Sequence, residues 1–464
     1  MNLNIITSSV ANVLLNPIFH LLSSCSNLRS CSQLPDPDWI ALGIHRVLQE
    51  CKSGRAFLQQ HAFRFHSDPP LSLYFESLKS PRRLSLVKEL NTQLCRLGNS
   101  ALHDSLSQFS DLNSFDIYAG DGHWHAAAAH DPRNEKGSKS ATGAFVAHNL
   151  RNHTVTHLAI GQGQKEHDMH VLKRLESTLL RQGAPKHRKV LYVWDKASID
   201  FHAWYRWKHN HSIYFISLQK ENANLIRCGT LPFDKTDPIN QGIISDEQVG
   251  CAAGMMIRRV TYTNPVDGVT YRVLTNEMTI RPGLIVFLYK SRWDIEKFFD
   301  EKKNKLEEKK SWASSITAKA IQMEFICLVH NLMLLLEAKL ETEGIRNEAE
   351  DKRRAERLDE AREQARRNGG QLPSPLELVK RATSRSVKLI RWIRSCLLDH
   401  TLWADATPRL RLLYSKLLIE FWTPFLIDFV NHIEKSVERG LTSKGHIHYS
   451  PNSGTEFCPF WLTD

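Results

Sequence analysis

Leu288-Tyr-Lys-Ser-Arg-Trp-Asp-Ile-Glu-Lys-Phe-Phe-Asp-Glu-Lys-Lys303 is the stretch that decides how this chain is interpreted. It contains neither Gly nor Pro, and it predicts one continuous helix. Tyr289, Glu296 and Lys303 are separated by two helical turns each. Arg292 lies one turn before Glu296, so all four side chains leave the same face of the predicted helix. One carboxylate is therefore aligned with two cations and a phenol.

The chemistry of that face suggests phosphoryl transfer on a nucleic acid. A carboxylate suits a hard metal ion, whereas arginine and lysine suit phosphate. Ile295, Phe299 and Leu306 leave another face and can anchor the helix in a core. The plainer alternative is that Arg292 and Glu296 form an ordinary i,i+4 surface ion pair, worth only about 0.3–0.5 kcal/mol.

Length and composition are those expected of a DNA-binding enzyme. The chain has 464 residues, enough for two or three domains, and 42% of them are hydrophobic. Its net charge of +11 and sequence pI of about 9.2 favour polyanionic partners. The 9 cysteines are scattered and include no CxxC pair, so we expect no disulfide framework and a reducing, cytoplasmic setting. Neither a signal peptide nor a membrane span is predicted, because the apolar start lacks a preceding basic segment and no apolar run reaches about 18 residues.

The pattern along the chain predicts three regions. Residues 1–110 carry apolar residues at helical spacing and form either a small DNA-binding bundle or a packing cap. Residues 111–336 alternate strands with helices, which is typical of an α/β domain, and include a β insertion at about residues 221–284. Residues 337–464 are predicted to be a helical C-terminal region for dimerisation or DNA contact, and they begin with a solvated helix of mixed charge.

Within the α/β region the chain alternates between short apolar runs and amphipathic segments. Strands are predicted at Phe115–Ala119, Gly143–Asn149, Thr154–Ile160, Lys189–Trp194 and Ser212–Ser217. Helices are predicted at His167–Gln182 and His202–His209. In the insertion, two runs that flank Asn264-Pro-Val-Asp-Gly268 resemble a hairpin.

Two aspartates are predicted to end strands of this region. Asp121 follows the first strand, and Asp195 follows the strand Lys189–Trp194. Side chains converge at strand ends in an α/β sheet. Together with Glu296, these residues form a set of three carboxylates that can hold two divalent ions about 3.5–4 Å apart. Two rival carboxylates lie off these positions: Asp200 and Asp294.

These features resemble the DDE transposases of bacterial insertion sequences, in the subgroup that carries a Tyr-Arg-Glu-Lys signature. Tyr289, Arg292, Glu296 and Lys303 match the spacing of that signature without a gap. The two strand-end aspartates match the first and second acidic residues of the family, and the β insertion before the glutamate helix also fits. The resemblance covers roughly residues 115–335.

The resemblance implies an RNase H-like mixed sheet flanked by helices, two Mg²⁺ or Mn²⁺ ions, and an enzyme that cleaves and transfers DNA strands at the ends of an insertion sequence. Carried over by position, the catalytic residues and metal ligands are Asp121, Asp195 and Glu296. The residues that would contact the DNA backbone are Tyr289, Arg292 and Lys303. The implied partner is double-stranded DNA, at the element ends and the target, bound by a homodimer.

Alternative functions remain open. His123 and His125 share one face of a strand and could hold a metal together with Asp121, although packing or a DNA contact would also explain them. An RNase H-like nuclease would cut DNA without strand transfer. A domesticated transposase would bind DNA without cutting it.

The β insertion departs from the family pattern in one respect. Family members that cut through a DNA hairpin often stack a flipped base on a tryptophan in this insertion. Residues 221–284 contain no tryptophan, so Phe233 or Tyr262 would have to take that role. Three other tryptophans are expected in the core: Trp204, Trp207 and Trp293.

Overall fold

The architecture was obtained from a computed structural model of the chain. It describes residues 9–411 apart from short gaps at 27, 30–32, 50–52, 66–68, 126, 134–136, 138, 140, 162–165, 167, 252–253, 265–267, 307–309, 346–355, 357–358, 361, 365, 368–373, 383–384 and 386. The chain divides into two units, Met1–Pro408 and Arg409–Asp464, and the described strands lie in the first. The part of the predicted C-terminal helical region beyond residue 411 lies outside the described residues.

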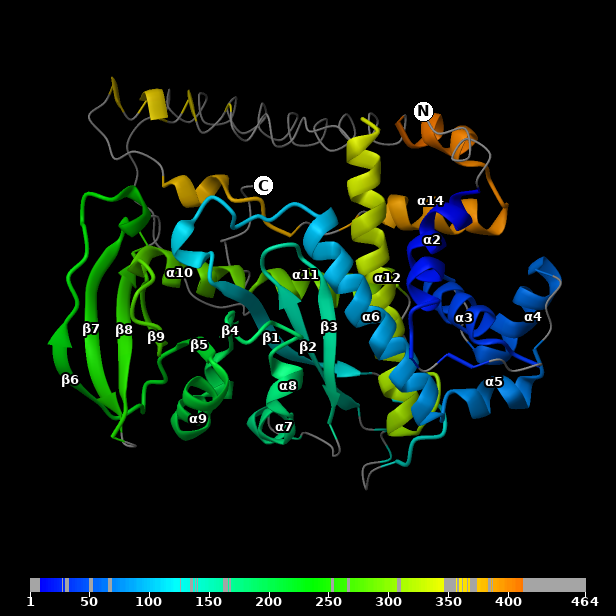
Figure 1. Cartoon of the computed structure of the whole chain (residues 1–464), viewed down its shortest axis with the longest axis horizontal. Helices are drawn as coiled ribbons and strands as arrows, with labels where there is room; N and C mark the ends of the chain where they lie inside the picture. The colour runs from blue at the N-terminus through cyan, green and yellow to red at the C-terminus, as the bar shows by residue number, and fades with distance from the viewer. Residues whose placement is uncertain are drawn as a thin grey trace, which may run out of the picture. The chain divides into compact units, whose positions relative to one another are not determined.

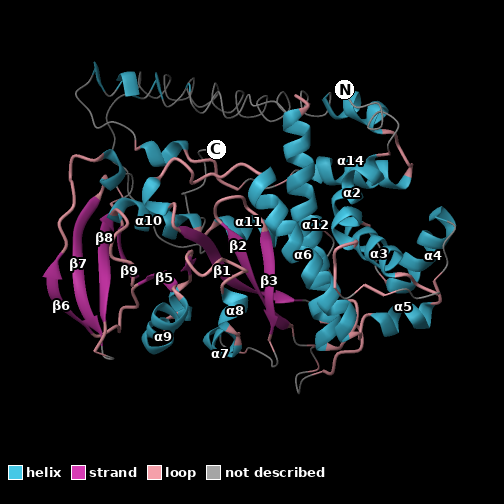
Figure 2. Ribbon diagram, in the orientation of Figure 1, coloured by secondary structure: helices cyan, strands magenta, loops and turns pink. Residues whose placement is uncertain are grey.

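A nine-stranded mixed sheet forms the centre of the first unit, in the order β3-β2-β1-β4-β5-β9-β8-β7-β6 (Figures 1 and 2). The first five strands in the chain are β1 (Phe115–His125), β2 (Thr142–Asn149), β3 (Val155–Ile160), β4 (Lys189–Val193) and β5 (Ile213–Leu218). Strands β1, β4 and β5 are parallel to one another, whereas β2 and β3 are antiparallel to their neighbours. The mixed sheet with flanking helices confirms the predicted α/β, RNase H-like fold class.

The β insertion continues the same sheet. Its strands are β6 (Leu225–Thr230), β7 (Ile243–Cys251), β8 (Met256–Thr263) and β9 (Thr270–Thr275). Strand β9 pairs antiparallel with β5, from Ile216↔Thr275 to Leu218↔Val273. The predicted hairpin is the β8–β9 pair. The insertion is therefore joined to the central sheet by backbone hydrogen bonds.

The two faces of the central strands are covered by different helices. Tyr118, Tyr192 and Trp194 leave one face and pack in a core with residues of α7 (Asp168–Arg174), α8 (Ser177–Leu180) and α9 (Phe201–His211). Because side chains alternate along a strand, the odd-numbered residues of β1 and β4 leave the opposite face. In Figure 1 that side of the central strands carries α10 (Pro282–Ser291) and α11 (Asp294–Asp300), and α11 contacts β1.

The single helix predicted for residues 288–303 is wrong. Helix α10 ends at Ser291, and a tight turn follows, in which Arg292 N donates to Tyr289 O at 3.1 Å and Glu296 N donates to Trp293 O at 3.1 Å. After α11 the chain forms a π-helical turn, η4 (Glu301–Lys305), in which Leu306 N donates to Glu301 O at 2.8 Å. Irregular turns of this kind arise where side-chain contacts override helix propensity.

The region before the sheet is helical, as predicted. Its helices are α2 (Val10–Leu22), α3 (Asp36–Leu48), α4 (Gly54–Phe65), α5 (Leu71–Ser77) and α6 (Pro81–Ala101). The long helix α12 (Ile316–Thr342) packs against α6, α3 and β3. Helix α12 has the length and hydropathy of a membrane span, but it is mostly buried in the fold, as a core helix is.

Candidate active site

Asp121 and Asp195 occupy equivalent positions on neighbouring parallel strands. The β1–β4 register pairs Ala119 with Val193, and each aspartate lies two residues further along its chain. Parallel neighbours are about 4.8 Å apart, so both carboxylates leave the sheet side by side. They leave the face that α10 and α11 cover, because they share the odd-numbered face of the two strands.

Strand β1 does not end at Asp121, contrary to the prediction. It continues to His125, paired with β2 alone, and Asp121 lies opposite Val146. What ends before Asp121 is the pairing with β4, whose last partner in β1 is Ala119. Asp121 therefore lies just past the point where β4 no longer pairs with β1.

Two glycines beside Asp121 allow close packing of aromatic rings. A Cβ atom at Gly120 would lie 2.0 Å from the ring of Trp194, and one at Gly122 would lie 2.6 Å from the ring of Phe145. Both rings belong to the core on the opposite face of the sheet. Side chains at these two positions would push β1 away from its neighbours, so the glycines keep Asp121 in register with Asp195.

Arg292 joins the sheet to the helical segment, which is the stretch made of α10, α11 and the π-helical turn η4. Its Nη1 atom lies 2.7 Å from Asp121 Oδ2, and the residue is 8% exposed. Asp121 Oδ1 accepts a hydrogen bond of 2.8 Å from Gly122 N. Burial raises the pKa of Asp121 to about 6 despite these two contacts, and the charges of Glu296 and Asp195 add to the rise.

Glu296 and Tyr289 belong to the same electrostatic cluster. Burial raises the pKa of Glu296, Arg292 lowers it, and the charge of Asp195 raises it. The pKa of Tyr289 is also raised by burial, with opposing effects from Arg292 and Asp195. The structure thus brings Asp121, Asp195 and Glu296 within electrostatic range of one another, around Arg292.

The carboxylates fit a divalent cation by their chemistry. All are hard oxygen donors, and burial raises the pKa values of Asp121 and Glu296 even though Arg292 lowers them. As positioned, however, no group of three or more His, Cys, Asp or Glu side chains within the described part of the chain is close enough to hold a metal ion. That holds for His123 and His125 as well, which belong to no such group in the described part of the chain. His123 instead stacks on Phe299 of α11, with 4.6 Å between ring centroids.

Lys303 is exposed on the π-helical turn, whereas its neighbour Lys302 is buried. The π-helical turn removes Lys303 from the common helical face that the spacing predicted. In the described structure no contact joins Lys303 to the carboxylates, so its place in the site stays a prediction.

Two exposed tryptophans lie beside the site. Trp293 directly follows Arg292 and is 48% exposed, so its predicted core position is wrong. Trp124, three residues after Asp121, is 52% exposed, and sequence reasoning gave it no role. Trp204 is 1% exposed and is a core residue, as predicted. The sequence around Trp124 could have indicated its exposure, because its neighbours in the chain are polar and no apolar periodicity includes it.

The rival carboxylates have structural partners. Asp200 caps α9 through Ala203 N at 2.9 Å and pairs with Lys173, and its pKa is lowered. Asp294 is buried and bound by Arg381, with Nε to Oδ2 at 2.8 Å. Neither contact directs these side chains toward Asp121 or Asp195.

Comparison with known proteins gives one result that bears on this site. Residues 108–332 match the family model described as "Transposase DDE domain". The matched region contains all six predicted site residues. No curated protein matches the chain.

Proposed function

We propose that this chain, whose residues 108–332 match the transposase DDE domain, is a transposase that cleaves DNA at the ends of an insertion sequence and transfers the resulting strand ends to a target. We also assign it to the subgroup with the Tyr-Arg-Glu-Lys signature. The observation that carries the proposal is the equivalent position of Asp121 and Asp195 on adjacent parallel strands, with Arg292 bound to Asp121 and Glu296 within electrostatic range of both aspartates.

The three carboxylates are the proposed metal ligands. Asp121, Asp195 and Glu296 would hold two Mg²⁺ or Mn²⁺ ions, which when bound supply Lewis-acid stabilisation to the attacking and leaving oxygens of a phosphodiester. Asp195 is oriented by its own backbone, since Oδ1 accepts a hydrogen bond of 2.6 Å from Lys196 N. Asp121 is oriented in the same way by Gly122 N.

The remaining residues of the signature are proposed to bind the DNA backbone. Arg292 offers a planar guanidinium that binds phosphate with two parallel hydrogen bonds. Tyr289 interacts with Arg292 and would present its hydroxyl group to a phosphate oxygen. Lys303 is exposed and would add a point charge on the same backbone.

The proposed partner is double-stranded DNA, which a homodimer would bind in the cytoplasm. The net charge of +11 supports a polyanionic partner. A hairpin intermediate receives little support from the insertion. Tyr262 is buried, accepts a hydrogen bond of 2.9 Å from Lys290 Nζ and lies under that ammonium group, so its ring is not available to a base. Phe233, which is half-buried, is the remaining candidate.

A strand-joining assay tests the proposal. The protein is incubated with a linear element end, a supercoiled plasmid and Mg²⁺, and Glu296→Gln serves as the matched inactive control. Joined products with the wild-type protein alone would support a transposase. Nicked or shortened DNA without joining would favour a plain nuclease. Binding without cleavage by the wild-type protein would favour a domesticated DNA-binding protein.

A further inference from the structure

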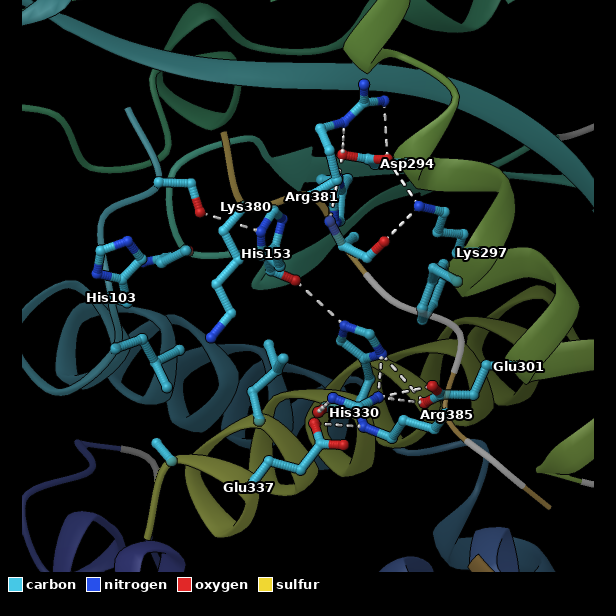
Figure 3. Close-up of a pocket in the computed structure, with 18 of the residues that line it drawn as sticks. His103, His153, Asp294, Lys297, Glu301, His330, Glu337, Lys380, Arg381 and Arg385 are labelled. Atoms are coloured by element: carbon cyan, nitrogen blue, oxygen red, sulfur yellow. Dashed lines mark hydrogen bonds and ion pairs between the residues drawn. The ribbon is translucent and has the colours of Figure 1, made fainter. Parts of the chain in front are cut away.

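The described residues of the 380–385 segment, Lys380, Arg381, Ala382 and Arg385, lie against the helical segment that carries Glu296 (Figure 3). This 380–385 segment comes from beyond the family match, which ends at residue 332. Its two arginines, Arg381 and Arg385, contact the two irregular points of the helical segment, where the chain departs from a regular α-helix. One point is the turn between α10 and α11, and the other is the π-helical turn after α11.

Arg381 bridges the first irregular point. Its Nε and Nη2 atoms bind both carboxylate oxygens of Asp294, at 2.8 and 2.9 Å. Nη2 also donates to Lys290 O, in the last turn of α10, at 3.3 Å. One side chain therefore contacts both sides of the turn that contains Arg292. Lys297 of α11 adds a hydrogen bond between the same two segments, which its Nζ atom donates to Ala382 O.

Arg385 holds the second irregular point. Its Nη1 atom lies 2.6 Å from Oε2 of Glu301, the first residue of the π-helical turn. Its Nε atom lies 2.9 Å from Glu337 Oε2 on α12. His330 of α12 adds a contact of 3.1 Å between Nδ1 and Glu301 Oε1. Burial alone would raise the pKa of Glu301, but the charges and hydrogen bonds of Arg385 and His330 lower it to about 2.

The ion pairs are more informative about geometry than about stability. Asp294 and Glu301 are each 2% exposed, and Arg385 is 5% exposed. Buried ion pairs add little net stability, because the cost of desolvating both charges offsets their attraction. They do fix orientation, because a planar guanidinium bound to two carboxylate oxygens allows few arrangements. The two carboxylates held by arginines lie on either side of Glu296 in the sequence. Asp294 is two residues before it, and Glu301 is five residues after it.

We propose that Arg381 and Arg385 are positioning residues that hold the α10–α11 turn and the π-helical turn so that Glu296 and Arg292 face Asp121 and Asp195. The inference rests on the proposed function of that carboxylate cluster. It also assigns a role to the chain beyond the matched domain, since the C-terminal region would supply part of the support of the active site.

A ligand site between the same elements is the competing interpretation. The cavity beside these residues has a volume of about 90 Å³, enough for a few waters or a small ion. Its lining balances four cations with four carboxylates: Lys297, Lys380, Arg381 and Arg385 against Asp294, Glu301, Glu337 and Glu341. Each of these arginines already binds a carboxylate, so the lining favours neither an anion nor a cation.

The test separates positioning from simple stabilisation by comparing two arginines, each of which binds both oxygens of one buried aspartate. Arg381→Gln removes the bidentate contact with Asp294. The matched control, Arg258→Gln, removes a bidentate contact of the same kind in the insertion, where the more deeply buried Arg258 binds Asp246 at 2.6 and 2.8 Å. Mn²⁺ affinity is measured by calorimetry, DNA binding by gel shift, and stability by urea unfolding.

We expect Arg381→Gln to weaken Mn²⁺ binding at least about tenfold, the effect typical of lost support behind metal ligands. DNA affinity should change by less than about twofold, because phosphate contacts dominate it. Arg258→Gln should lose stability and keep wild-type Mn²⁺ affinity. Equal Mn²⁺ affinity in folded Arg381→Gln and wild type would overturn the proposal. If Arg381→Gln does not fold, Arg381→Lys replaces it, and unchanged Mn²⁺ affinity there would overturn the proposal as well.

Hydrogen exchange keeps the inference testable if the proposed function fails. Should the wild-type protein bind no Mn²⁺, the metal chemistry is refuted, yet the support of the helical segment can still be measured. Faster amide exchange across residues 288–305 in Arg381→Gln, and not in Arg258→Gln, would support positioning. Unchanged exchange in that segment would overturn it.

Discussion

Replacing Asp121 with asparagine should stabilise the metal-free protein, and the gain should depend on pH. Burial raises the pKa of Asp121 from the ordinary 3.8 to about 6, with Glu296 and Asp195 contributing. The folded state therefore binds more protons than the unfolded state between these two values. Stability contributed by the neutral carboxyl is present below the lower value and is lost as pH rises through about 6. The asparagine side chain of the mutant carries no charge at any pH and escapes this loss.

The size of the effect follows from the two pKa values. A difference of about 2 units corresponds to about 3 kcal/mol, and about 2 kcal/mol of it falls between about pH 4 and about pH 7. The ion pair between Asp121 and Arg292 is lost in the mutant, which opposes the gain. At about pH 4 the carboxyl is neutral, so the lost attraction matters only at about pH 7, where the pKa of about 6 already includes it. The change with pH is therefore the quantity to measure.

Urea unfolding in the presence of a chelator measures this change. The free energy of unfolding of Asp121→Asn minus that of wild type should become more positive from about pH 4 to about pH 7. Asp111→Asn is the matched control. Burial alone would raise the pKa of Asp111, but Arg281 at 2.8 Å lowers it. This substitution should therefore be destabilising by a nearly constant amount from about pH 4 to about pH 7, because the lowered pKa lies below that range.

A difference between Asp121→Asn and wild type that does not change with pH would refute the reasoning. It would mean that Asp121 ionises normally and lies outside the influence of Glu296 and Asp195. A second experiment repeats the urea unfolding with Mg²⁺ in place of the chelator. Mg²⁺ should raise the urea midpoint of wild type and leave that of Asp121→Asn unchanged. Equal shifts in both proteins would remove Asp121 from the metal ligands.

Three further predictions concern DNA. Glu296→Gln should abolish Mg²⁺-dependent nicking and leave the gel-shift affinity nearly intact, because an amide is a poor Mg²⁺ ligand; nicking at the wild-type rate would remove Glu296 from the site. Lys303→Ala should reduce the slope of log affinity against log salt by about one unit, and an unchanged slope would exclude a phosphate contact. Trp124→Ala should weaken binding to unpaired element ends by about 1–3 kcal/mol if the exposed ring stacks on a base, whereas equal affinity would make its exposure incidental.

The central strands were predictable because local sequence determines them. Lys189–Val193 is a short apolar run that ends before a polar residue, which is the pattern of a buried parallel strand. The equivalence of Asp121 and Asp195 then follows from a parallel register that pairs Phe115 with Lys189. Strands β6 and β7 were missed because β6 is largely exposed and β7 contains the polar run Ser245-Asp-Glu-Gln248. Neither strand has the alternation that marks a half-buried strand.

The broken helix and the exposure of Trp293 could not be read from spacing. Residues 288–303 have good helix-forming composition, and nothing nearby in the chain explains the turn at Arg292. The partners that accompany the two irregular points are more than 80 residues further along, at Arg381 and Arg385. Trp293 lies on that turn, so its direction depends on the same distant contacts.

The pKa directions of the carboxylates on this helical segment separate two roles that sequence spacing could not. Burial raises the pKa of Glu296 and leaves it raised, as it does for Asp121, and the neighbouring carboxylates add to the rise. Asp294 and Glu301 are also buried, but arginines of the 380–385 segment lower the pKa of both. A carboxylate whose charge is already satisfied has little to gain from a metal ion, whereas one that is kept from ionising gains most. Under the proposed function, the carboxylates toward the sheet would be the ones to gain from a metal ion, and those toward the 380–385 segment would hold the turn in place.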